Sequence, residues 1–193
     1  MLWHPLLPGR LPDSAGAAEA AAAAITRWGL SHLAAVVAFA VIALAFVAVR
    51  GFLRERGDGW VSAVGLGSVV IGSTLYATLP GMEFSAVAAH ETGADLVATQ
   101  DALVSWFVPV LLVGSLLFTM GTVLFAVAVA VTRTATFGLV ATAVVGGALV
   151  VFGLARLVPV GAVQFYVQPA AALLALLPLA VAIGAGRRAT STR

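Results

Sequence analysis

Hydrophobic residues form five long runs along this chain, and the charged residues lie between the runs. No acidic, basic or histidine side chain interrupts the interior of a run. Each run has about 17 to 27 residues, the length that an α-helix needs to cross a hydrocarbon core about 30 Å thick. The predicted spanning helices cover about residues 30–50, 60–79, 104–131, 135–155 and 165–185. The pattern therefore predicts an all-α fold, a polytopic transmembrane helical bundle of five spans.

The predicted transmembrane domain comprises residues 29–185, and an N-terminal segment, residues 1–28, precedes it. This segment begins with a proline-rich tail, and either Asp13 or Ser14 caps an alanine-rich helix that follows the tail. The helix either runs straight into the first span or breaks at Gly29 and lies along the membrane surface. The sequence does not choose between these two arrangements.

The longest connection, residues 80–103, joins the second and third spans. Its first half mixes apolar and polar residues up to a break at Gly93, which is typical of a short interfacial helix. We therefore expect a short helical cap on this side of the bundle. After the last span, residues 186–193 form a short tail.

The arginines indicate how the bundle is oriented. All ten basic residues are arginines, because the chain has no lysine. Seven lie on the side of the bundle that includes the C-terminus, and only Arg10, Arg27 and Arg156 lie on the other side. The positive-inside rule therefore places the N-terminus outside and the C-terminal tail in the cytoplasm, in a multi-pass protein of the cell membrane. The arginines cluster just beyond the ends of the spans, so they are explained by membrane topology. The basic composition therefore does not indicate nucleic acid as a partner.

The composition excludes several classes of protein. Charged residues make up 9% of the chain, whereas a soluble globular domain has about 25%. The chain has no cysteine, which excludes disulfides and thiolate sites. Ion-coupled transporters and intramembrane hydrolases usually place ionisable side chains within the bilayer, and the interiors of the predicted spans have no acidic, basic or histidine side chain. The sequence favours a non-enzymatic accessory, binding or scaffold protein. Its expected partners are the lipid bilayer and either other membrane subunits or a second copy of the chain.

The three histidines suggest an alternative function. His4, His32 and His90 all fall on the predicted outer side, near Glu83. Imidazole and carboxylate ligands without a thiol suit zinc or another divalent metal, and two facing histidines are the ligands of a haem iron. The chain has no compact ligand motif, so separate segments would have to converge. Otherwise these are interfacial histidines that pair with neighbouring acids, and no cofactor is expected.

Arg156 lies at the outer end of the fourth span, against the positive-inside rule. A charge at this depth is expected to pair with an acidic group or to extend to water. Asp101 and Glu83 are the candidate partners of an anchoring ion pair. The alternative is that Arg156 contacts an anionic ligand or a lipid headgroup.

Hydroxyl and amide groups are the polar groups inside the spans. They belong to Ser68, Ser73, Thr74, Tyr76, Ser115, Thr119, Thr122, Thr142 and Gln168. Most lie in the second and third spans, so we expect any polar seam between these two helices. Such a seam suits a passive channel or carrier for a neutral or lipid-like solute. The alternative is that each hydroxyl bonds to a carbonyl of its own helix.

A pattern near the N-terminus resembles uncharacterised small multi-pass membrane proteins of bacteria. It consists of His4-Pro5, then Trp28, and then His32 at the start of the first span. The resemblance covers the first 35 residues and the general hydropathy. Since these proteins have no assigned activity, it implies no site residue and no cofactor. It does imply that His4 and His32 lie close together.

Overall fold

The structure is a computed structural model that describes residues 12–132 and 137–191. These residues form helices and no strand. The α-helices are α1 (Ser14–Ala23), α2 (Ile25–Arg54), α3 (Val61–Met82), α4 (Phe84–Thr92), α5 (Leu96–Thr132), α6 (Leu139–Leu154) and α7 (Gln168–Ser191). Between α6 and α7 lie a 3-10 turn, η1 (Ala155–Leu157), and a π-helical turn, η2 (Val163–Val167). The predicted all-α class is confirmed.

Five helical segments are long and apolar enough to cross a membrane. They are Ile25–Arg54, Val61–Thr92, Leu96–Thr132, Leu139–Leu157 and Val163–Gly186. Large apolar side chains such as Leu44, Leu139 and Leu173 point outward and are more than 60% exposed. A helix that is apolar on all sides is stable in lipid, because its backbone groups form their hydrogen bonds within the helix. The prediction of a five-span transmembrane bundle is therefore confirmed.

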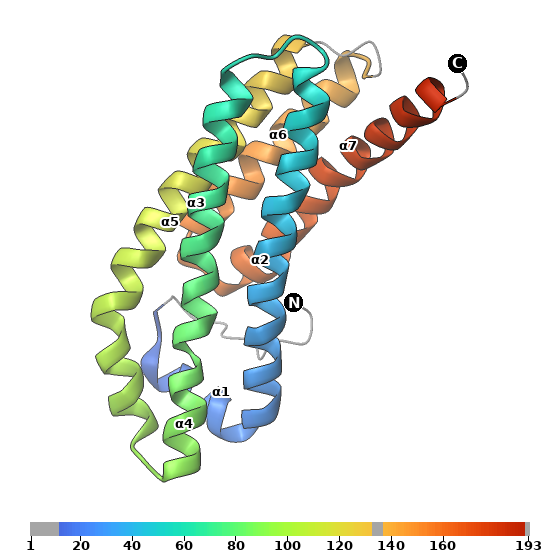
Figure 1. The fold of residues 1–193 in the computed structure, drawn as a ribbon. Coiled ribbons are helices and arrows are strands. Elements are labelled where there is room, and N and C mark those ends of the chain that lie inside the picture. The colour runs from blue at the N-terminus through green and yellow to red at the C-terminus, as the bar shows by residue number, and fades with distance from the viewer. Residues whose placement is uncertain (1–11, 133–136, 192–193) are drawn as a thin grey trace.

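Figure 1 shows the spans as a roughly parallel bundle, with α7 running obliquely away from α2 toward its C-terminal end. Helices α1 and α4 both lie at the lower end in this view, which we call the α1–α4 end. The connection between α2 and α3 lies at the opposite end. The chain therefore places the predicted N-terminal helix and the predicted helical cap together.

Glycines let the backbones of α3 and α5 pack closely against each other. A methyl group added at Gly72 would lie 2.7 Å from the backbone nitrogen of Phe118, and one added at Gly121 would lie 2.8 Å from the carbonyl oxygen of Gly65. Only glycine permits such backbone contact, which is how helices associate in lipid. This pair forms the centre of the bundle.

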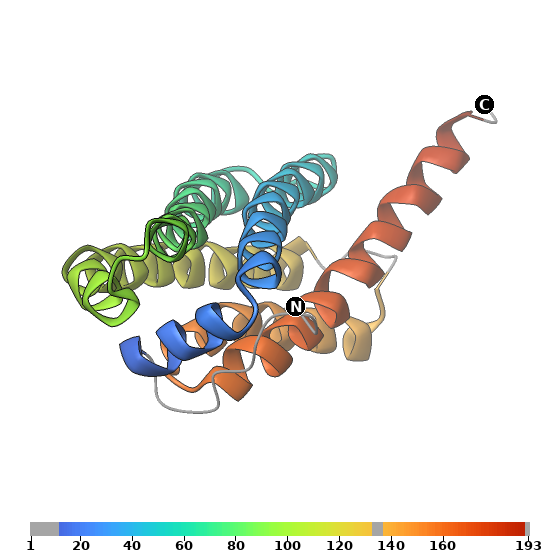
Figure 2. The ribbon, with the colours of Figure 1, turned by 90° about the horizontal axis from the view of Figure 1, so that it is seen from below.

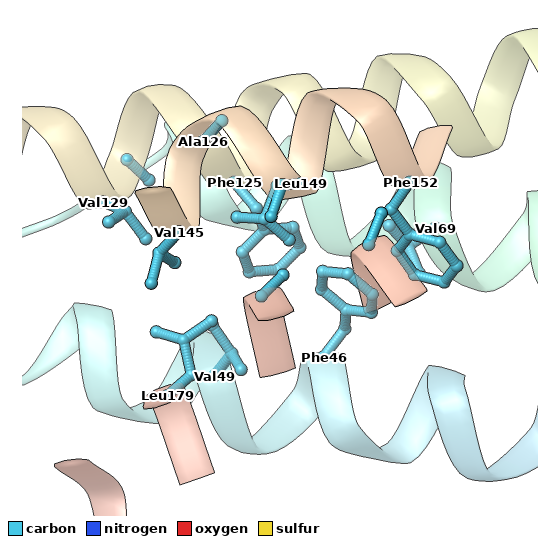
Figure 3. Close-up of a cluster of buried hydrophobic side chains, with 14 of the residues drawn as sticks. Phe46, Val49, Val69, Phe125, Ala126, Val129, Val145, Leu149, Phe152 and Leu179 are labelled. Atoms are coloured by element: carbon cyan, nitrogen blue, oxygen red, sulfur yellow. The ribbon is translucent and has the colours of Figure 1, made fainter. Parts of the chain in front are cut away.

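Aromatic rings join the remaining helices to this centre. Phe46 of α2 packs on Phe125 of α5, with ring centroids 4.7 Å apart. Phe118 of α5 meets Phe152 of α6 edge to face at 5.0 Å. Figure 3 shows Leu179 of α7 in the same cluster as Phe46, Phe125 and Phe152. Each such aromatic pair contributes about 1 kcal/mol beyond its buried area.

The alanine-rich helix α1 does not continue into α2. It begins after Asp13, whose Oδ1 accepts a hydrogen bond from the Gly16 amide at 2.9 Å, as expected for a cap. It ends at Ala24, where the backbone leaves the helical region (φ −156°, ψ 63°). The break therefore lies five residues before Gly29. Its physical reason is packing, since α1 must turn there to place Ala17 and Ala21 against Trp28 and Ala86.

Most of the predicted loop 80–103 is helical. Helix α4 forms the expected cap and ends at Gly93, which adopts a left-handed conformation (φ 71°) that favours glycine. Helix α5 then begins at Leu96, eight residues before the predicted start of the third span. The Asp95 carboxylate explains the early start, because it accepts hydrogen bonds from the amides of Val97 and Ala98 at 2.9 and 3.0 Å.

Candidate functional site

A pocket of about 340 Å³ lies at the α1–α4 end of the bundle. Figure 2, which views this end, shows α1 turned away from the axis of α2 and lying alongside the other helices. The start of α1, the first half of α2, the end of α3, the first half of α5 and the turns η1 and η2 all contribute to the wall. Most of the wall is apolar. Its apolar side chains include Ala35, Phe39, Leu79, Phe107, Leu111 and Phe165.

The pocket brings together three residues that the sequence singled out separately. His32 from α2, Glu83 from the α3–α4 junction and Arg156 from η1 all line it. Two glutamines, Gln100 and Gln164, complete the polar part of the wall. The site is therefore an apolar cavity with a small number of convergent polar groups, the usual composition of a ligand pocket.

His32 is held in a fixed orientation by the turn of helix before it. Its Nδ1 donates a hydrogen bond to the Trp28 carbonyl oxygen at 2.7 Å, and the two rings pack with centroids 4.5 Å apart. The four-residue spacing places Trp28 and His32 on one face of α2. Because Nδ1 carries the hydrogen, a neutral ring has its acceptor lone pair on Nε2.

Glu83 and Gln100 connect two walls of the pocket. Gln100 Nε2 donates a hydrogen bond to Glu83 Oε2 at 2.8 Å. Gln100 is buried on the second turn of α5, so the early start of this helix is what brings the amide to Glu83. Gln100 was not predicted as a site residue, because the sequence pattern placed it in the loop 80–103.

Arg156 lies in the wall without a carboxylate partner. Its Cζ is 5.1 Å from the centroid of the Tyr76 ring, within the range of a cation–π contact. Its Nε is buried and has no hydrogen-bond partner among the described residues. Within the same residues no salt bridge joins it to Asp101 or Glu83. Asp101 is exposed on α5 and does not line the pocket, so the expected anchoring pair does not form.

Gln164 fixes the backbone that carries Arg156. Its Nε2 donates hydrogen bonds to the carbonyl oxygens of Arg156 and Val158, at 3.2 and 2.9 Å. One turn later Gln168 Nε2 donates to the Phe152 carbonyl oxygen at 3.3 Å. Gln164 was not predicted from the sequence, because its position depends on the π-helical turn Val163–Val167. The π-helical turn that directs it is of a kind often found at functional sites.

The metal hypothesis receives no support from the residues that the structure describes. Within them, no group of three or more histidine, aspartate or glutamate side chains is close enough to hold a metal ion. His32 and Glu83 line the pocket, whereas His90 is exposed on α4 and does not. His4 lies outside the described residues. A metal or haem site stays a prediction that needs His4, and so does the proximity of His4 to His32.

Buried hydroxyls do lie between α3 and α5, where a polar seam was expected. The buried side-chain oxygens belong to Ser73 and Tyr76 of α3 and to Ser115 and Thr119 of α5. The Ser115 hydroxyl interacts with the Tyr76 hydroxyl across the two helices. Three further hydroxyls follow the alternative arrangement. Those of Ser68, Thr74 and Thr122 each donate a hydrogen bond to a carbonyl of their own helix. The pocket lining includes none of the four residues of the seam.

Comparison with known proteins adds no relative. No family model matches the chain, and no curated protein and no solved structure is significantly similar to it. The class therefore follows from the fold and the pocket alone. This is a five-span, all-α membrane protein with a mostly apolar pocket, whose wall includes Arg156.

Proposed function

We propose that the protein is a non-enzymatic binding protein of the cell membrane. In this proposal the α1–α4 end faces outward, and the pocket there holds a small amphipathic molecule. The positive-inside rule supports the orientation, because Arg50, Arg54 and Arg56 gather at the opposite end. The pocket then lies in the outer half of the bilayer, where molecules with one polar end and one apolar end concentrate.

The observation that carries the proposal is the composition of the pocket wall. Its volume of about 340 Å³ falls at the low end of the range for ligand pockets, about 300–1,000 Å³. Apolar side chains such as Phe39 and Phe107 suit a hydrocarbon chain. The polar groups of His32, Glu83 and Arg156 suit one polar head. A small single-chain amphiphile satisfies both requirements.

The experiment compares a variant that fills the pocket with a matched control. Ala35 lines the pocket on α2, whereas Ala40 lies on the same helix, is exposed and does not line it. Binding of a fluorescent single-chain amphiphile is measured by titration into the protein in phosphatidylcholine nanodiscs. We expect Ala35→Phe to weaken binding at least about tenfold, a cost of about 1.4 kcal/mol, and Ala40→Phe to leave it unchanged. Equal saturable binding by both variants and the unaltered protein would rule out this pocket as the site.

A further inference from the structure

Arg156, the only arginine among the described residues of the pocket wall, faces a cavity in which neither carboxylate is paired with it. Asp13 and Glu83 are the acidic residues of the wall. The Asp13 carboxylate accepts the Gly16 amide and caps α1. The Glu83 carboxylate accepts a hydrogen bond from Gln100. Over the described residues, neither carboxylate lies within salt-bridge distance of Arg156.

The guanidinium group of Arg156 packs over Tyr76 of α3. Glu83 follows Tyr76 by seven residues, about 10 Å along a helix axis.

An unpaired guanidinium group in an apolar wall is costly. Removing a charge from water is unfavourable unless it is paired and hydrogen-bonded. The Tyr76 ring compensates for a part of this cost. The buried Nε of Arg156 still has no acceptor among the residues described. The missing partner is an anionic oxygen, because arginine pairs with carboxylate and phosphate through two parallel hydrogen bonds.

We propose that the ligand supplies this partner: it is a single-chain amphiphile with an anionic carboxylate or phosphate head that binds Arg156. The inference rests on the proposed function and adds the chemistry of the head group. The head lies against Arg156, and the chain lies along the apolar wall that Phe39, Leu79, Phe107 and Leu111 form. Gln164 contributes by holding the backbone of Arg156 in place.

The experiment varies the head group at constant chain length. Palmitic acid, hexadecanol and a lysophosphatidic acid with a palmitoyl chain are titrated against the protein in phosphatidylcholine nanodiscs, by displacement of the fluorescent amphiphile. We expect at least one of the two acids to bind ten times or more tightly than the alcohol. The acid that binds more tightly identifies the head as carboxylate or phosphate.

Two substitutions test the role of Arg156. In Arg156→Gln the preference for the acid over the alcohol disappears, whereas Arg156→Lys keeps the charge and retains a part of it. Arg27→Gln is the control, because Arg27 lies at the same end of the bundle and does not line the pocket. Thermal unfolding of the free protein provides the second readout. Arg156→Gln is expected to unfold at the same or a higher temperature, which separates lost binding from lost folding.

The outcomes separate the two proposals. Equal affinity for acid and alcohol, with Ala35→Phe still weakening both, overturns the anionic head group and leaves the binding pocket intact. An acid preference that survives in Arg156→Gln also overturns it. If none of the three amphiphiles displaces the probe and Ala35→Phe has no effect, the binding function itself is overturned, and the inference fails with it.

Discussion

The guanidinium carbon of Arg156 lies 5.1 Å from the centre of the Tyr76 ring, and this contact joins the turn η1 to α3. Tyr76 also packs on Phe39 and Phe118, at centroid distances of 5.3 and 5.4 Å. One ring therefore connects α2, α3, α5 and η1. Its hydroxyl group interacts with the Ser115 side chain of α5.

This arrangement predicts effects of different size for two substitutions of Tyr76. Tyr76→Phe keeps the ring and removes only the hydroxyl group beside Ser115, so the free energy of unfolding should fall by no more than about 1.5 kcal/mol. Tyr76→Leu removes the ring contacts and should lower it by about 2–4 kcal/mol. Chemical unfolding in detergent micelles measures both. If the phenylalanine variant is as unstable as the leucine variant, the hydroxyl group and not the ring stabilises this part of the bundle.

The glycine contact between α3 and α5 predicts a difference between two alanine substitutions on one helix. Gly72→Ala places a methyl group 2.7 Å from the Phe118 nitrogen, so the helices must separate, at a cost of about 1–3 kcal/mol. A methyl group at Gly67 meets nothing within 4 Å, so Gly67→Ala should be neutral or slightly stabilising. The midpoint temperature of thermal unfolding in detergent is measured for both variants. Equal midpoints would contradict the close packing of α3 on α5 at Gly72.

The hydrogen bonds of Gln164 predict that its amide stabilises the segment between α6 and α7. Gln164→Leu leaves two carbonyl oxygens without their donor, and we expect a loss of about 1–3 kcal/mol. Thr74→Val is the control, because its exposed hydroxyl bonds only to Val70 of its own helix and should cost less than about 0.5 kcal/mol. Hydrogen exchange of residues 157–163 should increase in the leucine variant alone. Unchanged exchange there would show that the amide does not hold this turn.

The proposed orientation predicts which side of the membrane each loop faces. The natural chain has no cysteine, so single cysteines can be introduced without background. Glu91, on α4, and Glu55, after α2, are both exposed and lie at opposite ends of the bundle. In intact cells a membrane-impermeant maleimide should label Glu91→Cys and not Glu55→Cys, and both should react after permeabilisation. The reverse pattern would invert the topology and place the pocket on the cytoplasmic side.

The parts of the fold that could be predicted are those that hydropathy determines. Lipid requires about 20 apolar residues in each span, and that requirement is visible in a single sequence. Helix ends were less predictable, because they depend on individual contacts. The cap at Asp95 extends α5, and the packing of Ala21 on Trp28 ends α1 early. Such contacts involve neighbours that a hydropathy profile does not identify.

Several residues of the candidate site could be predicted from the sequence, but the pocket that they line could not. His32, Glu83 and Arg156 stood out because each is polar at a span end. Their convergence depends on how α2, α3 and α6 pack, which the sequence pattern does not specify. The two glutamines were harder to identify. Gln100 requires the true start of α5, and Gln164 requires a π-helical turn that has no clear sequence signature.

The close packing of α3 on α5 affects how mutations in this protein should be interpreted. Glu83 follows α3 directly, Tyr76 belongs to α3, and Gln100 belongs to α5, so one stiff body carries all three. A substitution at Gly72, near the middle of α3, would change how α3 and α5 pack. It would therefore displace Glu83, Tyr76 and Gln100 at the same time. Impaired ligand uptake in such a mutant would reflect a displaced scaffold. Direct contact should be inferred only for variants that leave this scaffold undisturbed.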